Sequence, residues 1–114
     1  MDDCLFCKII NGEIPSTKVY EDDFVYAFLD IAPKAPFHAV FVPKIHIDSP
    51  AKIDSDNSIY VAKIYEAIAK TAKNENLEKG FRVVANCGED GGQTVGHIHF
   101  HLLGGINLAE KLEK

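Results

Sequence analysis

Three histidines recur at every second position near the carboxyl end of the chain: His97, His99 and His101. Apolar residues alternate with them. Because successive side chains of a β-strand point to opposite faces, the pattern predicts a strand with all three imidazoles on one face, about 6.5–7 Å apart, and a core-facing apolar side. Imidazole titrates near neutral pH, so this face concentrates groups suited to acid–base, nucleophilic or metal-binding chemistry.

The residue pattern alone leaves three explanations for the histidine face. An exposed sheet face could simply tolerate histidine, although a random surface would more often carry Lys, Thr or Glu. Adventitious metal binding and catalysis are about equally supported by the three histidines. The segment from Gly88 to Thr94, rich in glycine, favours catalysis, because it can turn tightly and expose backbone N–H groups to an anionic oxygen.

The elements that must position these residues can be predicted from periodicity and turn residues. Helical period and cap residues predict a short helix over residues 4–10 and a long helix over residues 58–74. Apolar runs bounded by turn residues predict a hairpin over 19–29 and strands over 37–42, 81–85 and 98–103. Several strands and one long helix, without alternating βαβ units, indicate an antiparallel α+β domain spanning residues 1–114.

Charge and composition exclude several classes of protein. The net charge is −5, Arg82 is the only arginine and no basic cluster exists, so we expect no nucleic-acid partner. No apolar run is long enough to cross a bilayer, and the acidic start Met1-Asp2-Asp3 does not resemble a secretory signal, so we expect no membrane partner and a cytoplasmic location. Three cysteines, two of them in a Cys-x-x-Cys pair, favour metal or redox chemistry over disulfides.

The segment His97-Ile98-His99-Phe100-His101-Leu102-Leu103 resembles the signature of the histidine triad (HIT) superfamily. Four other segments are similar to the family in order and spacing, so the resemblance covers nearly the whole chain: residues 4–15, residues 28–33, residues 38–47, and Asn86 with residues 91–94. Leu103-Gly104-Gly105 resembles the Hint-type branch. The resemblance implies a five-stranded antiparallel sheet with one long helix and a short N-terminal helix.

The resemblance also implies an activity: hydrolysis of purine nucleoside 5′-monophosphate derivatives, namely phosphoramidates or acyl-adenylates. His99 matches the nucleophile, which would form a covalent nucleotidyl-histidine. Its second ring nitrogen should donate to the carbonyl of His97, while His101 would contact phosphate oxygens and the leaving group. The proton donor to the leaving group is either His101 or the substrate itself.

Several further residues are expected to bind the nucleotide. Asp30 would accept hydrogen bonds from both ribose hydroxyls, because a carboxylate accepts two donors. The loop residues Gly92, Gln93 and Thr94 are candidates to bind phosphate, and Asn86 would either reach phosphate or order the loop. His38 is a further substrate-binding candidate. The candidates to contact the base are apolar: Ile31, Phe6, Ile10, Phe28 and Phe41. For each of the apolar residues, an ordinary core position is the alternative.

A second site is implied for structural zinc. Some bacterial members of the family carry zinc at positions that correspond to Cys4, Cys7, His46 and His97, a closed set with no place for catalytic water. The alternative is a reduced, unliganded Cys-x-x-Cys.

The remaining expectations concern assembly and two local features. The family further implies a homodimer. Residues 106–114 could form a short amphipathic helix, and Cys87 is expected to be buried. A nucleotide-binding protein with incidental turnover is the alternative function.

Overall fold

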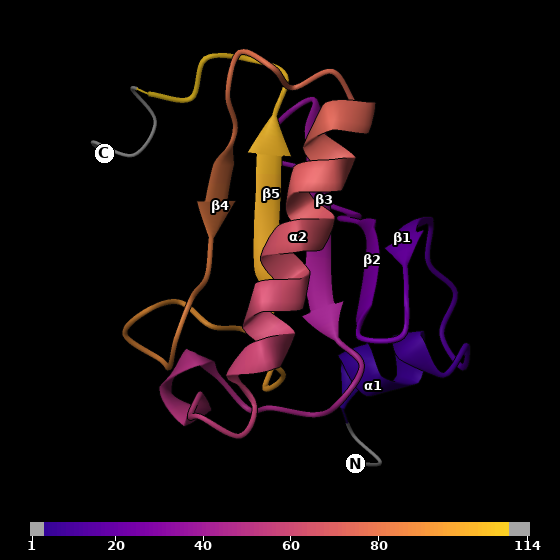
Figure 1. Cartoon of the computed structure of the whole chain (residues 1–114), viewed down its shortest axis with the longest axis vertical. Coiled ribbons are helices and arrows are strands. Elements are labelled where there is room, and N and C mark those ends of the chain that lie inside the picture. The colour runs from indigo at the N-terminus through magenta and orange to yellow at the C-terminus, as the bar shows by residue number, and fades with distance from the viewer. Residues whose placement is uncertain (1–3, 110–114) are drawn as a thin grey trace.

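Eight elements follow one another along the chain of the computed structural model, which describes residues 4–109. They are α1 (Leu5–Ile10), β1 (Lys18–Glu21), β2 (Val25–Leu29), β3 (Phe37–Pro43), the 3₁₀ helix η1 (Pro50–Lys52), α2 (Ser58–Asn74), β4 (Arg82–Val84) and β5 (Phe100–Gly104). The strands form one antiparallel sheet in the order β1-β2-β3-β5-β4 (Figure 1). The predicted fold class and its five strands are confirmed.

The two helices cover opposite faces of the sheet. Alternate residues of β2 and β3, among them Ala27 and Phe41, pack with the buried stripe of α2 in the main core. The residues between them, such as Phe28 and Val40, form a second apolar cluster with α1. Since strand side chains alternate between faces, the two clusters must lie on opposite sides. Figure 1 shows α2 lying along the sheet and α1 at one end of it.

The strand that carries the histidines begins later than predicted. β5 starts at Phe100, paired with Phe41 of β3, so His97 and His99 lie in an irregular segment before the ladder. The ladder cannot continue because Pro43 has no N–H to donate. The Pro43 carbonyl instead accepts from the His97 side chain.

One local prediction is wrong. Cys87 is exposed rather than buried, because it lies in the polar loop, where its thiol contacts the Ser49 hydroxyl at 3.7 Å. The N-cap position of α2 is occupied by Asn57, whose side chain makes no cap bond because its carboxamide oxygen accepts from the Asp54 N–H at 2.8 Å instead.

Two other features bear on the sequence-based expectations. The predicted C-terminal helix falls partly on residues 110–114, which lie outside the described residues, and residues 106–109 are not helical. Within residues 4–109, no helix has the length and apolar character that a membrane span requires.

Candidate active site and metal centre

The three histidines of the triad lie on the face of the sheet that α1 covers. His101 pairs directly with Val40, a member of the α1-side cluster. The rings of His99 and His101 lie 5.1 Å apart, centroid to centroid. The apolar residues between the histidines point into the α2-side core: Ile98, Phe100 and Leu102. The alternation predicted from the sequence therefore holds even where regular strand geometry does not.

His99 is held in one orientation and one tautomer. Its Nδ1 lies 2.8 Å from the carbonyl oxygen of His97. Because a carbonyl can only accept, Nδ1 must carry the hydrogen, which leaves the Nε2 lone pair of the neutral ring free. The edge of the Phe6 ring packs against the imidazole at 5.0 Å between centroids. The residue is thus a buried imidazole with one available nucleophilic nitrogen.

A hydrogen-bond chain sets the tautomer of His101. The Lys34 backbone N–H donates to His38 Nδ1 at 3.0 Å, so neutral His38 carries its hydrogen on Nε2. That nitrogen lies 2.8 Å from His101 Nδ1, which must therefore accept. Neutral His101 then has its hydrogen on Nε2, the nitrogen not engaged by His38. His101 is a hydrogen-bond donor in this state.

Burial keeps both histidines of this pair neutral near pH 7. It lowers the pKa of His101 to about 4, and the neighbouring His99 and His38 add to the effect while Asp30 opposes it. Burial also lowers the pKa of His38, again against the influence of Asp30, whose Oδ2 lies 3.4 Å from His38 Nε2. The pair can therefore orient and polarise a ligand without carrying charge.

A hollow of about 300 Å³ adjoins this pair of histidines, a volume near the lower end for small-molecule sites. It is lined by Asp30, Ala32, Lys34, His38, Val84, His101 and Leu103. Asp30 Oδ1 accepts from the Ala32 N–H at 2.8 Å, which orients the carboxylate at the rim. Ile31 is fully exposed beside it. Phe41 is completely buried in the α2-side core, so it cannot contact a base.

The glycine-rich loop before the triad is organised by its own side chains. Asn86 Nδ2 donates to the Gly91 carbonyl at 2.7 Å. The Gln93 amide donates to the carbonyls of Asp48 and Val95 at 2.7 and 2.9 Å and accepts from the Gly88 N–H at 2.9 Å. The backbone contributes as well, because the N–H groups of Gly92 and Gln93 donate to the carbonyls of Glu89 and Gly88 at 3.0 Å. These bonds together hold the shape of the loop.

Glycine is required or favoured at Gly91 and at Gly92 of this loop. A Cβ on Gly91 would lie 2.2 Å from the Cys87 carbonyl oxygen, and Gly92 has a φ of +80°. Side chains rarely adopt that conformation. Thr94, the remaining predicted loop contact, is exposed.

Four predicted metal ligands converge beside the triad. The ligand atoms of Cys4, Cys7, His46 and His97 all lie within 4.8 Å of one another. His97 Nδ1 lies 3.3 Å from Cys4 Sγ and 3.5 Å from Cys7 Sγ, and His46 Nδ1 lies 3.4 Å from Cys7 Sγ. A tetrahedral zinc with ordinary Zn–S and Zn–N bonds places S and N ligands about 3.5 Å apart. The spacing therefore fits.

The surroundings of this cluster also suit a metal ion. His97 Nε2 donates to the Pro43 carbonyl at 3.1 Å, and His46 Nε2 donates to Asp48 Oδ1 at 2.8 Å. Both imidazoles therefore present an unprotonated Nδ1, as metal-bound histidines with outer hydrogen bonds do. The support that Asp48 and the Pro43 carbonyl give to the metal ligands was not predicted from the sequence. The position of Asp48 two residues after His46 is a weak indication of such a role, whereas the sequence gives no indication of which backbone carbonyl takes part.

A second group of possible ligands does not have the spacing of a metal site. Asp30, His38 and His101 also approach one another within 4.8 Å. However, the 2.8 Å between His38 Nε2 and His101 Nδ1 is a hydrogen-bond distance. Two nitrogen ligands of a tetrahedral zinc would lie about 3.3 Å apart. The two histidines therefore belong to the hydrogen-bond chain described above.

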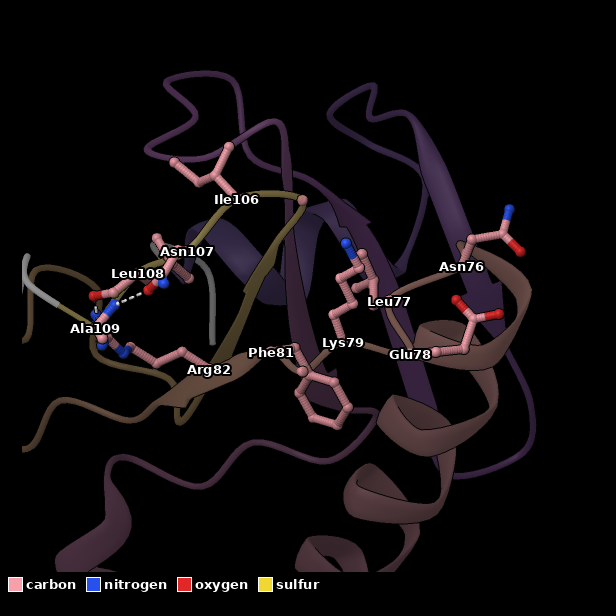
Figure 2. A pocket seen from close by; sticks show the side chains of 12 residues that line it. Asn76, Leu77, Glu78, Lys79, Phe81, Arg82, Ile106, Asn107, Leu108 and Ala109 are labelled. Atoms are coloured by element: carbon pink, nitrogen blue, oxygen red, sulfur yellow. Dashed lines mark hydrogen bonds between the residues drawn. The ribbon is translucent and has the colours of Figure 1, made fainter.

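A second hollow, of about 830 Å³, lies elsewhere and is not lined by any predicted site residue. Figure 2 shows it between the α2–β4 connection, which includes Leu77 and Phe81, and the segment after β5. Arg82 crosses it to donate to the Leu108 carbonyl at 2.7 Å. It has neither the histidines nor the carboxylate of the smaller hollow, so we place the active site at the latter.

Comparisons with known proteins identify the family. The HIT domain model matches residues 11–108. The purine nucleoside phosphoramidase of Escherichia coli is 41% identical over 112 residues, covering 97% of this chain and 94% of that protein. Protein HitA of Neisseria gonorrhoeae is 41% identical over 104 residues, covering 91% of this chain and 97% of HitA.

Solved structures agree as well. A histidine triad protein from Clostridium difficile is 53% identical with a TM-score of 0.92, and a HIT family hydrolase from Clostridium thermocellum is 45% identical with a TM-score of 0.92. In both cases the match covers 95% of each chain. The chain therefore belongs to the histidine triad (HIT) family, and it is an enzyme.

Proposed function

We propose that the chain hydrolyses purine nucleoside 5′-monophosphate derivatives, phosphoramidates or acyl-adenylates, through a covalent nucleotidyl-His99 intermediate. The observation that best supports this proposal is the hydrogen bond of 2.8 Å from His99 Nδ1 to the His97 carbonyl, which leaves Nε2 free to attack phosphorus. The 41% identity to a purine nucleoside phosphoramidase supports the substrate class.

The reaction has two steps at phosphorus. His99 Nε2 attacks the α-phosphorus and the P–N bond of the phosphoramidate breaks, while the amine departs with a proton that comes from His101 Nε2–H or is already carried by the substrate. Water then attacks the same phosphorus, its proton replaces the one that left with the amine, and the nucleoside monophosphate departs from neutral His99. The carbonyl of His97 stabilises the imidazolium that exists between these steps, because it keeps accepting from Nδ1.

Two groups of residues hold the substrate in this mechanism. His101, with its Nδ1 engaged by His38, offers Nε2–H to the phosphoryl oxygens as negative charge develops there. The hydroxyl and backbone N–H of Thr94 share that charge, while Asn86, Gln93 and the Gly92 N–H hold the loop. Asp30 accepts from the ribose hydroxyls, and the exposed Ile31 covers the base.

We further assign one structural zinc ion to the four-residue cluster. The ion fills a closed Cys₂His₂ set, so it supplies binding energy and rigidity rather than catalysis. Through Cys4 and Cys7 it ties α1 to the segment before β5. Metal analysis should find about one zinc per chain, and Cys4→Ser should lose the metal and lower the melting temperature. Full retention of zinc by that variant would contradict the ligand set.

The proposal includes a cytoplasmic location, which the reduced thiols suit.

The same proposal includes a homodimer. Among the described strands, β4 lies at one end of the sheet order and pairs only with β5, so its other edge is available to a second copy. Ile59 and Tyr65 on α2 are about half exposed, as residues at an interface would be in an isolated chain. Sedimentation equilibrium should give twice the chain mass, and a monomer at micromolar concentration would contradict this assignment.

Turnover of a simple substrate tests the function. Purified protein mixed with an adenosine 5′-phosphoramidate should release AMP, whereas His99→Asn should bind AMP without turnover. Asn retains hydrogen-bonding capacity but cannot form the intermediate. Binding of AMP by both proteins without turnover by either would favour the alternative function, a nucleotide-binding protein.

A further inference from the structure

One residue belongs to both the metal cluster and the nucleophile's support. The His97 ring lies among the metal ligands, with Nδ1 3.3 Å from Cys4 Sγ. The carbonyl of the same residue accepts the hydrogen bond from His99 Nδ1 at 2.8 Å. His97 is fully buried, so its ring and backbone have little freedom to move independently. A change in where the ring is held must reach the carbonyl that orients His99.

A second connection runs through α1. Phe6 stands between the two cysteines in sequence, and its ring packs edge-on against His99 at 5.0 Å and His97 at 6.0 Å between centroids. α1 has only six residues, and a helix of that length is not stable by itself. Its position depends on its packing and on Cys4, which caps it by accepting from the Cys7 N–H at 3.2 Å.

We infer that the Cys4–Cys7–His46–His97 cluster is a positioning site for the nucleophile: metal held there orients His99 through the His97 carbonyl and the Phe6 ring, so metal and nucleotide bind cooperatively. The nucleotide half of this inference rests on the proposed function. Coupling between two binding equilibria is reciprocal, so the factor by which metal tightens nucleotide binding must equal the factor by which nucleotide tightens metal binding. A zinc site that only adds stability would show neither effect.

The first test observes His99 directly and needs no nucleotide. In protein labelled with ¹⁵N-histidine, the zinc-loaded form should show His99 as a single tautomer with a slowly exchanging Nδ1–H. Removal of zinc should speed that exchange, while the His38–His101 pair, which contacts no metal ligand, serves as the control within the same spectrum. An unchanged His99 signal in folded, zinc-free protein would overturn the inference.

The second test measures the linkage. Calorimetry should show AMP binding about fivefold or more tighter to the zinc-loaded protein than to the stripped one, and chelator competition should show the same factor for zinc with and without AMP. Equal AMP affinities would overturn the inference. Failure of the zinc-loaded protein to bind AMP at all would count against the proposed function instead, with the spectrum of His99 still deciding the inference.

A variant covers the case in which the stripped protein unfolds. Phe6→Leu keeps all four metal ligands but removes the ring that touches His99, so zinc should still bind while exchange at His99 Nδ1 quickens. Ile9→Val, a change of similar size in the same helix and apolar cluster, is the matched control and should leave His99 unaltered. Identical exchange in both variants and the unmodified protein would contradict the route through Phe6.

Discussion

The neutral, buried His101 predicts a specific loss of stability in mild acid. Its pKa in the folded protein is about 4, whereas the unfolded chain has the ordinary value of about 6.5. Between these values the unfolded state binds more protons, so the free energy of unfolding falls as pH falls. The contribution is negligible above about pH 7.5 and reaches a loss of about 2 kcal/mol at pH 5. His38, His99 and Asp30 surround the ring and remain in place in the comparison below.

Urea unfolding of the unmodified protein and of His101→Gln, at pH 7.5 and pH 5, measures this contribution. Each protein also loses stability on acidification through its other groups, and the losses at groups distant from His101 cancel in the difference, whereas His38 and His99, which contact the ring, contribute to it. The unmodified protein should lose about 2 kcal/mol more than the variant. The same loss in both proteins would show that His101 is not held neutral by burial, and the assignment of its Nε2–H as a donor at neutral pH would fall with it.

Two further substitutions probe the binding loop and the carboxylate at the rim. Gly91→Ala should weaken AMP binding at least tenfold, because the added Cβ would meet the Cys87 carbonyl at 2.2 Å. Gly96→Ala is the control and should leave AMP binding unchanged, because no atom lies within 4 Å of its added Cβ. Calorimetry measures both affinities, and equal values would contradict this account of the loop. Asp30→Asn keeps an acceptor for the Ala32 N–H but loses charge at the ribose, so KM should rise about tenfold with kcat little changed, a loss of about 1.4 kcal/mol. Unchanged steady-state kinetics would remove Asp30 from the ribose site.

The sequence predicts well those features that depend on periodicity. Alternation places the histidines on one face, and the apolar stripe that includes Ile64 and Ile68 predicts α2, because each pattern directly records which side of an element is buried. The start of β5 could not be predicted. It depends on Pro43, which has no N–H to donate to a ladder, lying opposite the segment before β5, and this register joins residues far apart in the chain.

The candidate site likewise combines features that the sequence predicts with features that it does not. The Cys-x-x-Cys spacing indicated metal or redox chemistry, and the family resemblance implied the full ligand set that includes His46 and His97, which the structure brings together. The tautomer of His101 could not be predicted from the sequence, because it is set by the backbone N–H of Lys34 acting through His38. Every residue except proline carries a backbone N–H, so residue types do not indicate which one makes this bond. Burial of Cys87 was wrongly expected because cysteine is usually buried, whereas a polar, glycine-rich loop overrides that tendency.

The central claim is that His99 carries the nucleotide during turnover. The most direct measurement mixes enzyme with an adenosine 5′-phosphoramidate, quenches in base, where a phosphorus–nitrogen bond to histidine survives, and maps the adduct by mass spectrometry of peptides. The account predicts AMP attached to the peptide containing residues 97–101, and neither adduct nor turnover in His99→Asn. Turnover by that variant at the unmodified rate, or an adduct on another residue, would contradict it.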